Sequence, residues 1–171
     1  MRSAKFKAKL EKFSPESGWH YITVSAAAAG KFRFEEGSRR VVCRLEGRET
    51  LQCALMPYHD AFFIMVNKGI RTRLGIEPGD TLSVEIWKDE SKYGLPMPEE
   101  FREILDQDPE GDELFHGLTP GKQRSILYIL GKPKDLDRRI QMGLIVIEHL
   151  KDNEGKIDHS TLAQDLKRPV L

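Results

Sequence analysis

The sequence predicts an α+β protein in which a small closed β-barrel is followed by an all-α bundle. Two patterns indicate this fold: apolar and polar residues alternate along short segments of the N-terminal half, and apolar residues recur at helical spacing in the C-terminal half. A seam around residues 89–98, with prolines at its end, separates the two patterns. We therefore place a barrel domain at residues 1–90, a linker at 91–97 and a helical module at 98–171.

The first predicted strand, Lys5–Phe13, alternates polar and apolar residues, which places Phe6, Ala8, Leu10 and Phe13 near or on the inner face. Further predicted strands cover residues 19–24, 40–45, 51–55, 61–66 and 81–87. The pair 40–45 and 51–55 is expected to form a hairpin around Gly47. The continuous apolar run 61–66 is expected to be buried on both faces.

About six or seven strands of this length favour closure into a barrel, which would remove exposed edges. One short helix is predicted at Asn67–Gly75, with Ile70 and Leu74 facing inwards and Gly75 ending the helix. Four aromatic side chains are expected to line the interior or its mouth, and the interior is expected to be filled by side chains. These four are Trp19, Phe32, Phe34 and Trp87.

The helical module is predicted from its capping residues. Helices are expected to begin at Pro98, Asp108, Thr119 and Asp135, with a last short helix within residues 157–167. The helix after Asp135 is apolar around most of its circumference, which indicates a central helix packed on two sides. Its expected buried residues are Ile140, Met142, Leu144, Ile145, Val146, Ile147 and Leu150.

Composition narrows the class of protein. The 171 residues include 27 Lys+Arg and 27 Asp+Glu, so the net charge is zero, and the basic excess typical of a nucleic-acid-binding protein is absent. No apolar run approaches the roughly 20 residues that span a membrane, and the basic N-terminus leads into no apolar signal segment. We expect a cytoplasmic protein without a membrane span.

Catalytic and metal-binding motifs are not found in the sequence. Cys43 and Cys53 have no metal-ligand spacing and are expected to be free, buried thiols. His20 lies within a strand and His59 lies beside Asp60 in a turn, and none of the five histidines belongs to a recognised metal or triad motif. We expect no metal, no cofactor and no enzymatic activity.

Two blocks of sequence resemble known families. Phe63–Val84 resembles the signature of a β-barrel domain of unknown function. Residues 98–124, 132–134 and 138–140 are similar to the YdeI/OmpD-associated family of bacteria, also called bacteriocin-protection proteins. The resemblance implies a barrel followed by a helical module, and the family names imply a role in envelope stress or antimicrobial-peptide resistance. Where the family carries a threonine-arginine pair, this chain has Asp135-Leu136-Asp137-Arg138-Arg139.

Two basic clusters are the candidate binding sites. Lys68, Arg71 and Arg73 lie on the predicted short helix, where they could bind a small anion or a nucleic-acid backbone, or form a solvated basic face. The same helix and strand also resemble a segment of the SpoVT/AbrB-like transcription factors. The second cluster could bind phosphates or an acidic partner, or pair with neighbouring carboxylates. It comprises Lys134, Arg138 and Arg139, with Lys122, Arg124 and Lys132 before them.

These observations predict a non-enzymatic protein that binds a small anionic ligand or a protein partner. The family resemblance, not the residues, implies the context of envelope stress or antimicrobial-peptide resistance. A nucleic-acid-binding regulator is the alternative, with Lys68, Arg71 and Arg73 on the barrel as its contacts. A third possibility is an enzyme of unknown chemistry, which would need a carboxylate or thiol within hydrogen-bond reach of His20 or His59. The sequence leaves the ligand and the oligomeric state open.

Overall fold

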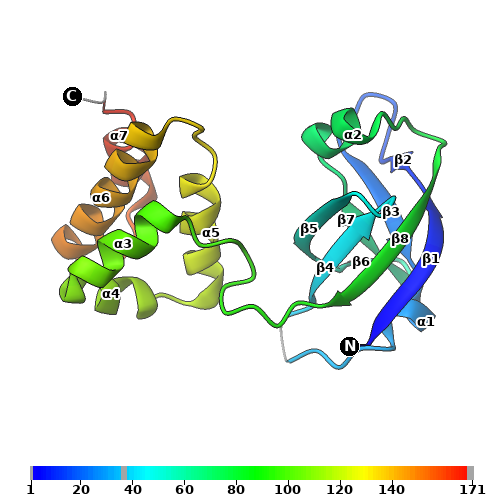
Figure 1. The fold of residues 1–171 in the computed structure, drawn as a ribbon, viewed down its shortest axis with the longest axis horizontal. Coiled ribbons are helices and arrows are strands. Elements are labelled where there is room, and N and C mark those ends of the chain that lie inside the picture. The colour runs from blue at the N-terminus through cyan, green and yellow to red at the C-terminus, as the bar shows by residue number, and fades with distance from the viewer. Residues whose placement is uncertain (1, 36–37, 169–171) are drawn as a thin grey trace. The chain divides into compact units, whose positions relative to one another are not determined.

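The computed structural model describes residues 2–35 and 38–168 (Figure 1). The chain divides into two compact units, one ending at Glu90 and the other beginning at Ser91. The first is built mainly of strands and the second of helices, so the predicted α+β class is confirmed. No helix among the described residues is long and apolar enough to cross a membrane.

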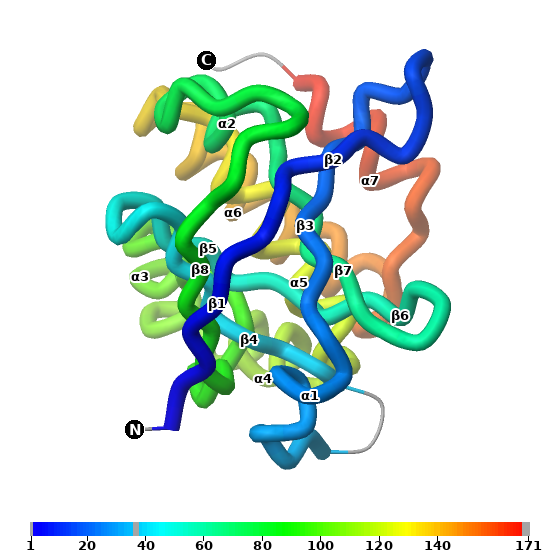
Figure 2. Tube along the Cα trace, turned by 90° about the vertical axis from the view of Figure 1, so that its right-hand side faces the viewer, coloured from blue at the N-terminus to red at the C-terminus, as the bar shows by residue number. Residues whose placement is uncertain are grey.

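The β unit contains eight described strands and two short helices. In chain order these are β1 (Ser3–Lys9), β2 (Glu11–Lys12), β3 (His20–Val24), α1 (Ala26–Ala29), β4 (Arg40–Leu45), β5 (Glu49–Ala54), β6 (Met56–Tyr58), β7 (Ala61–Met65), α2 (Lys68–Leu74) and β8 (Thr81–Lys88). The strands form two antiparallel sheets of four, in the orders β1-β8-β4-β5 and β2-β3-β7-β6. In Figure 2, β1 runs beside β8, and the two are paired from Ser3 opposite Trp87 to Lys9 opposite Thr81.

The predicted barrel is only partly realised, because neither described sheet closes on itself. Instead, the chain passes from one sheet to the other at Leu10, between β1 and β2, and at Leu55, between β5 and β6. Both leucines are fully buried. This is expected where the chain bends and continues from one sheet into a second sheet packed against it. Alternation along a strand predicts which side chains face inwards, but not which strand edges pair.

One side chain of the first predicted strand was misplaced. Ala8 and Leu10 are buried and Phe6 packs against the core as predicted, whereas Phe13 is exposed. Phe13 follows Leu10 by three residues, and the two-residue period of a strand puts such a residue on the opposite face. The prediction that the run 61–66 is buried on both faces is also wrong: Ile64 is buried, but the other four residues of β7 are partly exposed. α1 and β6 were not predicted.

The interior of the β unit is filled by side chains. Phe32 is buried and Phe34 packs against the same core cluster, as expected. Trp19 is 59% exposed, and Trp87 lies on the outer face of β8, where the Arg44 guanidinium sits 4.9 Å from its ring centroid. The expectation that these two tryptophans line the interior is therefore wrong.

The hairpin and the short helix are confirmed. β4 and β5 pair around a turn in which Gly47 has φ 67°, a backbone conformation that favours glycine. Asn67 caps α2 by accepting a hydrogen bond from the Ile70 N–H, and Gly75 ends it with φ 65°. Ile70 is buried, as predicted.

The helical unit contains α3 (Glu99–Gln107), α4 (Pro109–His116), α5 (Pro120–Leu130), α6 (Leu136–Asp152) and α7 (His159–Asp165). The side chains of Asp108, Thr119 and Asp135 cap α4, α5 and α6 by accepting a hydrogen bond from the N–H three residues later, which confirms the predicted helix starts. Pro98 is the residue before α3 rather than its first residue.

α6 is the central helix of this unit, since α3, α4, α5 and α7 all contact it. Close packing is visible at Gly143, where an added Cβ would lie 2.8 Å from Ile104 Cδ1. Phe101 and Phe115 meet edge to face in the core, with ring centroids 5.1 Å apart. Ile140 and Leu144 were predicted to be buried but are 37% and 52% exposed, because the neighbouring helices leave that side of α6 uncovered.

Candidate functional site

The first predicted cluster lies on α2, but two of its three cations are bonded to the protein. Arg71 Nη1 donates a hydrogen bond to the Val66 carbonyl oxygen at 2.7 Å. Arg73 Nε lies 3.1 Å from Glu49 Oε1 on β5. Lys68 is exposed in the first turn of α2. The helix therefore brings the three residues together, while the arginines also serve to hold α2 in place.

The two arginines of the second predicted cluster are also bonded to other parts of the protein. Arg138 donates to the backbone carbonyls of Leu166 and Arg168, which ties α6 to the end of α7. Arg139 Nη2 lies 2.8 Å from Glu100 Oε1, which ties α6 to α3. Lys134 is exposed before α6. Structural contacts thus account for both arginines.

A basic cavity that the sequence did not predict lies in the β unit. It has a volume of about 510 Å³ and is lined by Arg2, Lys31, Phe32, Arg33, Lys88 and Glu90. Arg2 precedes β1, residues 31–33 follow α1, and Lys88 ends β8. Arg2 Nη1 donates to the Lys31 carbonyl oxygen at 3.1 Å, which joins the first two of these segments.

Charge distinguishes this cavity, because four cations and one carboxylate line it. Within the described part of the chain, none of the four cationic side chains makes an ion pair. Like charges held close together repel one another, and a bound anion would relieve that repulsion. The site could not be predicted from the sequence, because antiparallel pairing of β1 with β8 is needed to bring Arg2 towards Lys88.

A second cavity in the β unit, of about 420 Å³, lies over β1, β4 and β8 and is also basic. Two of its three cations already have partners, however: Lys7 Nζ donates to Ser83 Oγ at 2.5 Å, and Arg44 Nη1 lies 3.4 Å from Glu85 Oε2. It therefore offers less unsatisfied charge than the cavity around Lys31.

The two histidines considered as catalytic candidates have no carboxylate or thiol partner in the described structure. His20 Nδ1 lies 3.0 Å from the Gly18 carbonyl oxygen. His59 is in a turn with φ 54°, and its ring packs on Tyr58. His149, which is buried between α6 and α7, accepts a hydrogen bond from the Asp158 N–H at Nε2, so it serves the fold.

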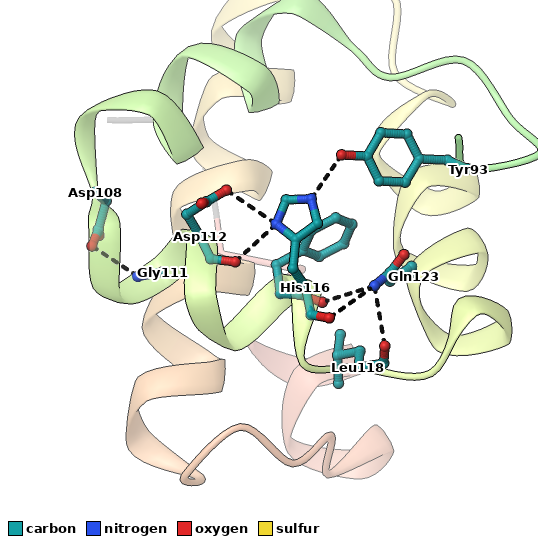
Figure 3. Close-up of polar contacts among 8 residues, drawn as sticks. Tyr93, Asp108, Gly111, Asp112, His116, Leu118 and Gln123 are labelled. Atoms are coloured by element: carbon teal, nitrogen blue, oxygen red, sulfur yellow. Dashed lines mark hydrogen bonds and ion pairs between the residues drawn. The ribbon is translucent and has the colours of Figure 1, made fainter. Parts of the chain in front are cut away.

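His116 has the partners that those histidines lack (Figure 3). Its Nδ1 lies 2.9 Å from the Asp112 carbonyl oxygen and 3.1 Å from Asp112 Oδ1, and its Nε2 lies 2.7 Å from the Tyr93 hydroxyl. Because Nδ1 faces two oxygens, the proton of the neutral ring belongs on Nδ1, and Nε2 accepts from Tyr93. The spacing of Asp112 and His116, one helical turn apart, was the available sequence signal; the contribution of Tyr93 depends on tertiary packing.

The neighbouring backbone is also fixed. Asp108 accepts a hydrogen bond from the Gly111 N–H at the start of α4. Past the end of α4, the Gln123 side-chain amide donates to the carbonyls of Phe115, His116 and Leu118 at 3.4, 3.3 and 3.1 Å (Figure 3). His116 faces a cavity of about 300 Å³. Its lining is Lys92, Tyr93, Met97, Arg102, Leu105, Asp106, Asp112, Glu113 and His116.

The cysteines are free, as predicted. Burial raises the pKa of the Cys53 thiol to about 12 and also raises the pKa of the Cys43 thiol. Both thiols therefore stay protonated at neutral pH, which makes them weak nucleophiles and weak metal ligands. Among the described residues, no group of three or more His, Cys, Asp or Glu side chains is arranged to hold a metal ion.

Fold and cavities define a two-domain α+β protein with a separate cavity in each unit. Residues 6–86 match the family described as Domain of unknown function (DUF1905), and residues 95–142 match the family described as Bacteriocin-protection, YdeI or OmpD-Associated. The chain is thus similar to DUF1905 over most of its β unit and to the YdeI/OmpD-associated family over part of its helical unit, and the resemblance seen in the sequence is confirmed in both parts and in their order. A search of curated proteins found no match.

Proposed function

We propose that this protein is a non-enzymatic binding protein and that its basic cavity in the β unit holds a small ligand carrying two or more negative charges. The observation that carries this proposal is the convergence of Arg2, Lys31, Arg33 and Lys88 on one cavity with a single carboxylate, Glu90. Guanidinium and ammonium groups bind phosphate and carboxylate oxygens through charge-assisted hydrogen bonds.

Phe32 adds an apolar wall to this cavity, and the aliphatic stems of the surrounding cations extend it. A phosphorylated organic molecule would use both the charge and the apolar wall, whereas a bare inorganic anion would use only the charge. The net charge of the whole chain is zero, so attraction for an anion would be local to this cavity rather than a property of the entire surface.

The test is a titration of the full chain with pyrophosphate, glucose 6-phosphate and ATP, followed by calorimetry. Lys31→Gln combined with Arg33→Gln should lower the affinity for the anion tenfold or more, because each charged hydrogen bond contributes about 1.5–3 kcal/mol. The matched control is Lys68→Gln combined with Lys134→Gln, which removes two exposed charges from the clusters that the sequence favoured. A control variant that loses as much affinity as the cavity variant would refute the cavity as the site.

Nucleic acid binding is the second candidate, and one observation favours it. Lys5, Lys7 and Lys9 are all exposed along β1, the strand that begins beside the basic cavity. Single-stranded DNA of increasing length separates the two functions. Affinity that rises with length and falls steeply with salt would favour nucleic acid, whereas binding that saturates with a mononucleotide would favour a small ligand.

The cellular context is also a proposal. The descriptions of the matched family name bacteriocin protection and association with YdeI or OmpD. We propose a role in antimicrobial-peptide or envelope stress, for which that description is the support, and a cytoplasmic location, as the sequence analysis expects. A strain lacking the protein should then be more sensitive to a bacteriocin or cationic peptide. Complementation with the Lys31→Gln, Arg33→Gln variant would show whether the anion cavity takes part in that phenotype.

A further inference from the structure

We propose that the cavity beside His116 binds a small zwitterion, an α-amino acid with an apolar side chain. This inference concerns the helical unit and does not depend on the anion site of the β unit. Both cavities are lined by charged side chains, but the charges of the cavity beside His116 are nearly balanced: Lys92 and Arg102 are cationic, and Asp106, Asp112 and Glu113 are carboxylates.

In the described part of the chain, the charged side chains that could bind a ligand make no contacts that hold the fold together. Within the described residues, the side chains of Arg102, Asp106 and Glu113 make no ion pair or hydrogen bond. Elsewhere in the same unit, Arg139 is held 2.8 Å from Glu100 and Lys151 is held 2.6 Å from Asp108. The planar fork of Arg102 suits a carboxylate, and the carboxylates of Asp106 and Glu113 suit an ammonium group.

The wall formed by Tyr93 and His116 favours an ammonium as well. The Tyr93 hydroxyl gives its hydrogen to His116 Nε2, so its oxygen retains lone pairs that can accept a further hydrogen bond. His116 is itself fixed by Asp112, which leaves the hydroxyl with a defined orientation before any ligand arrives. Preorganisation of this kind lowers the entropic cost of binding.

Size and apolar surface narrow the ligand class. A volume of about 300 Å³ is at the lower end of the range for ligand sites, which suits a molecule as small as a free amino acid. Met97 and Leu105 contribute the small apolar part of a lining that is mostly polar, and Leu105 belongs to the core of the unit. An aliphatic side chain would bury apolar area there, whereas a charged one would not.

The first experiment compares three probes by calorimetry on the full chain: L-leucine, L-leucinamide and N-acetyl-L-leucine. Leucinamide lacks the carboxylate and N-acetyl-leucine lacks the ammonium, so each should bind at least about tenfold more weakly than leucine. Equal binding of the three probes would overturn the proposal. So would a failure of L-leucine to bind at roughly 10 mM, which corresponds to almost no useful affinity.

Variants assign the two ends of the ligand. Arg102→Gln should abolish the preference for leucine over leucinamide, and Glu113→Gln should reduce the preference for leucine over N-acetyl-leucine, since Asp106 remains. Glu103→Gln and Lys122→Gln are the matched controls, because both residues are exposed in the same unit and neither lines the cavity. Retention of both preferences in the Arg102 and Glu113 variants would refute the site.

Folding and the anion site are monitored separately. Helical circular dichroism of each variant establishes that the unit is intact, and the Tyr93 ring resonances in NMR spectra report the cavity directly. The Lys31→Gln, Arg33→Gln variant should bind leucine as the native chain does, since those residues lie in the other unit. Loss of leucine binding in that variant would contradict the independence of the two cavities.

Discussion

The two cavities are both lined by charged side chains, but they differ in charge balance and in the way the chain builds them. The β-unit cavity has a surplus of cations, four against one carboxylate, and its charge is suited to attract an anion. The helical-unit cavity has both signs and a histidine fixed between a carboxylate and a phenol. A surplus of charge selects for the sign of a ligand, whereas an ordered pattern selects for its shape and polarity.

The residues that line the two cavities also differ in how far apart they lie along the chain. The β-unit cavity joins residues 2, 31–33 and 88–90, which only strand pairing brings together. The helical-unit cavity is assembled from residues 92–116, a single run that contains α3 and α4. The second cavity should therefore depend on the packing of neighbouring helices, and the first on the long-range order of the sheet.

Phe115→Ala should give the largest effect and affect one unit only. Phe115 is fully buried against Phe101 and Tyr93, and truncation of a buried phenylalanine typically costs about 3–5 kcal/mol. Helical circular dichroism at increasing urea should show this loss of stability in the helical unit. Tryptophan fluorescence should not change, because Trp19 and Trp87 are both in the β unit.

The matched control is Ile22→Ala, which removes a fully buried side chain from the β-unit core. It should lower the urea concentration at which tryptophan fluorescence reports unfolding, and it should leave the unfolding transition seen by helical circular dichroism unchanged. The two core clusters share no residue among those described, which is the basis for this separation. Transitions that move together in either variant would mean that the units unfold as one.

Prediction from sequence succeeded where the signal was local. Alternation predicted most strands, and the caps at Asp108, Thr119 and Asp135 predicted three helix starts, because these signals act within a few residues. Ile140 and Leu144 were misplaced because an apolar face shows that burial is possible, not that a neighbouring element covers it. The two cavities were missed because each depends on tertiary contacts: Arg2 with Lys31, and Tyr93 with His116.

Thiol labelling sharpens the comparison through the β unit, where both cysteines lie. Since burial raises the pKa of both thiols, 5,5′-dithiobis(2-nitrobenzoate) at neutral pH should label the native chain at least about a hundredfold more slowly than the urea-unfolded chain. Cys53 should react before Cys43, which is fully buried. Phe115→Ala should leave this rate unchanged. Rapid labelling in the native chain would mean that the β unit opens more readily than its packing indicates.

Asp108→Asn should give the smallest effect, and its dependence on pH identifies the cause. The hydrogen bond from Lys151, at 2.6 Å, and that from the Gly111 N–H lower the pKa of Asp108. A carboxyl whose pKa is lower in the folded state stabilises that state above its ordinary pKa of about 3.9, and loses this contribution as the pH falls through the lowered value.

Asparagine can still accept the capping hydrogen bond from Gly111 through its Oδ1, so the substitution removes the ion pair with Lys151 and the hydrogen bond that accompanies it. The melting temperature of Asp108→Asn should therefore fall by a few degrees at pH 7, and the difference from the native chain should shrink below about pH 4. Asp106→Asn is the control, because that carboxylate has no ion-pair partner among the described residues and should show no such dependence. A deficit that persists undiminished in acid would contradict the charge interaction as its cause and would mean that asparagine caps α4 less well than aspartate does. The start of α4, and with it the placement of Asp112 and His116, would then rest on hydrogen-bond geometry alone.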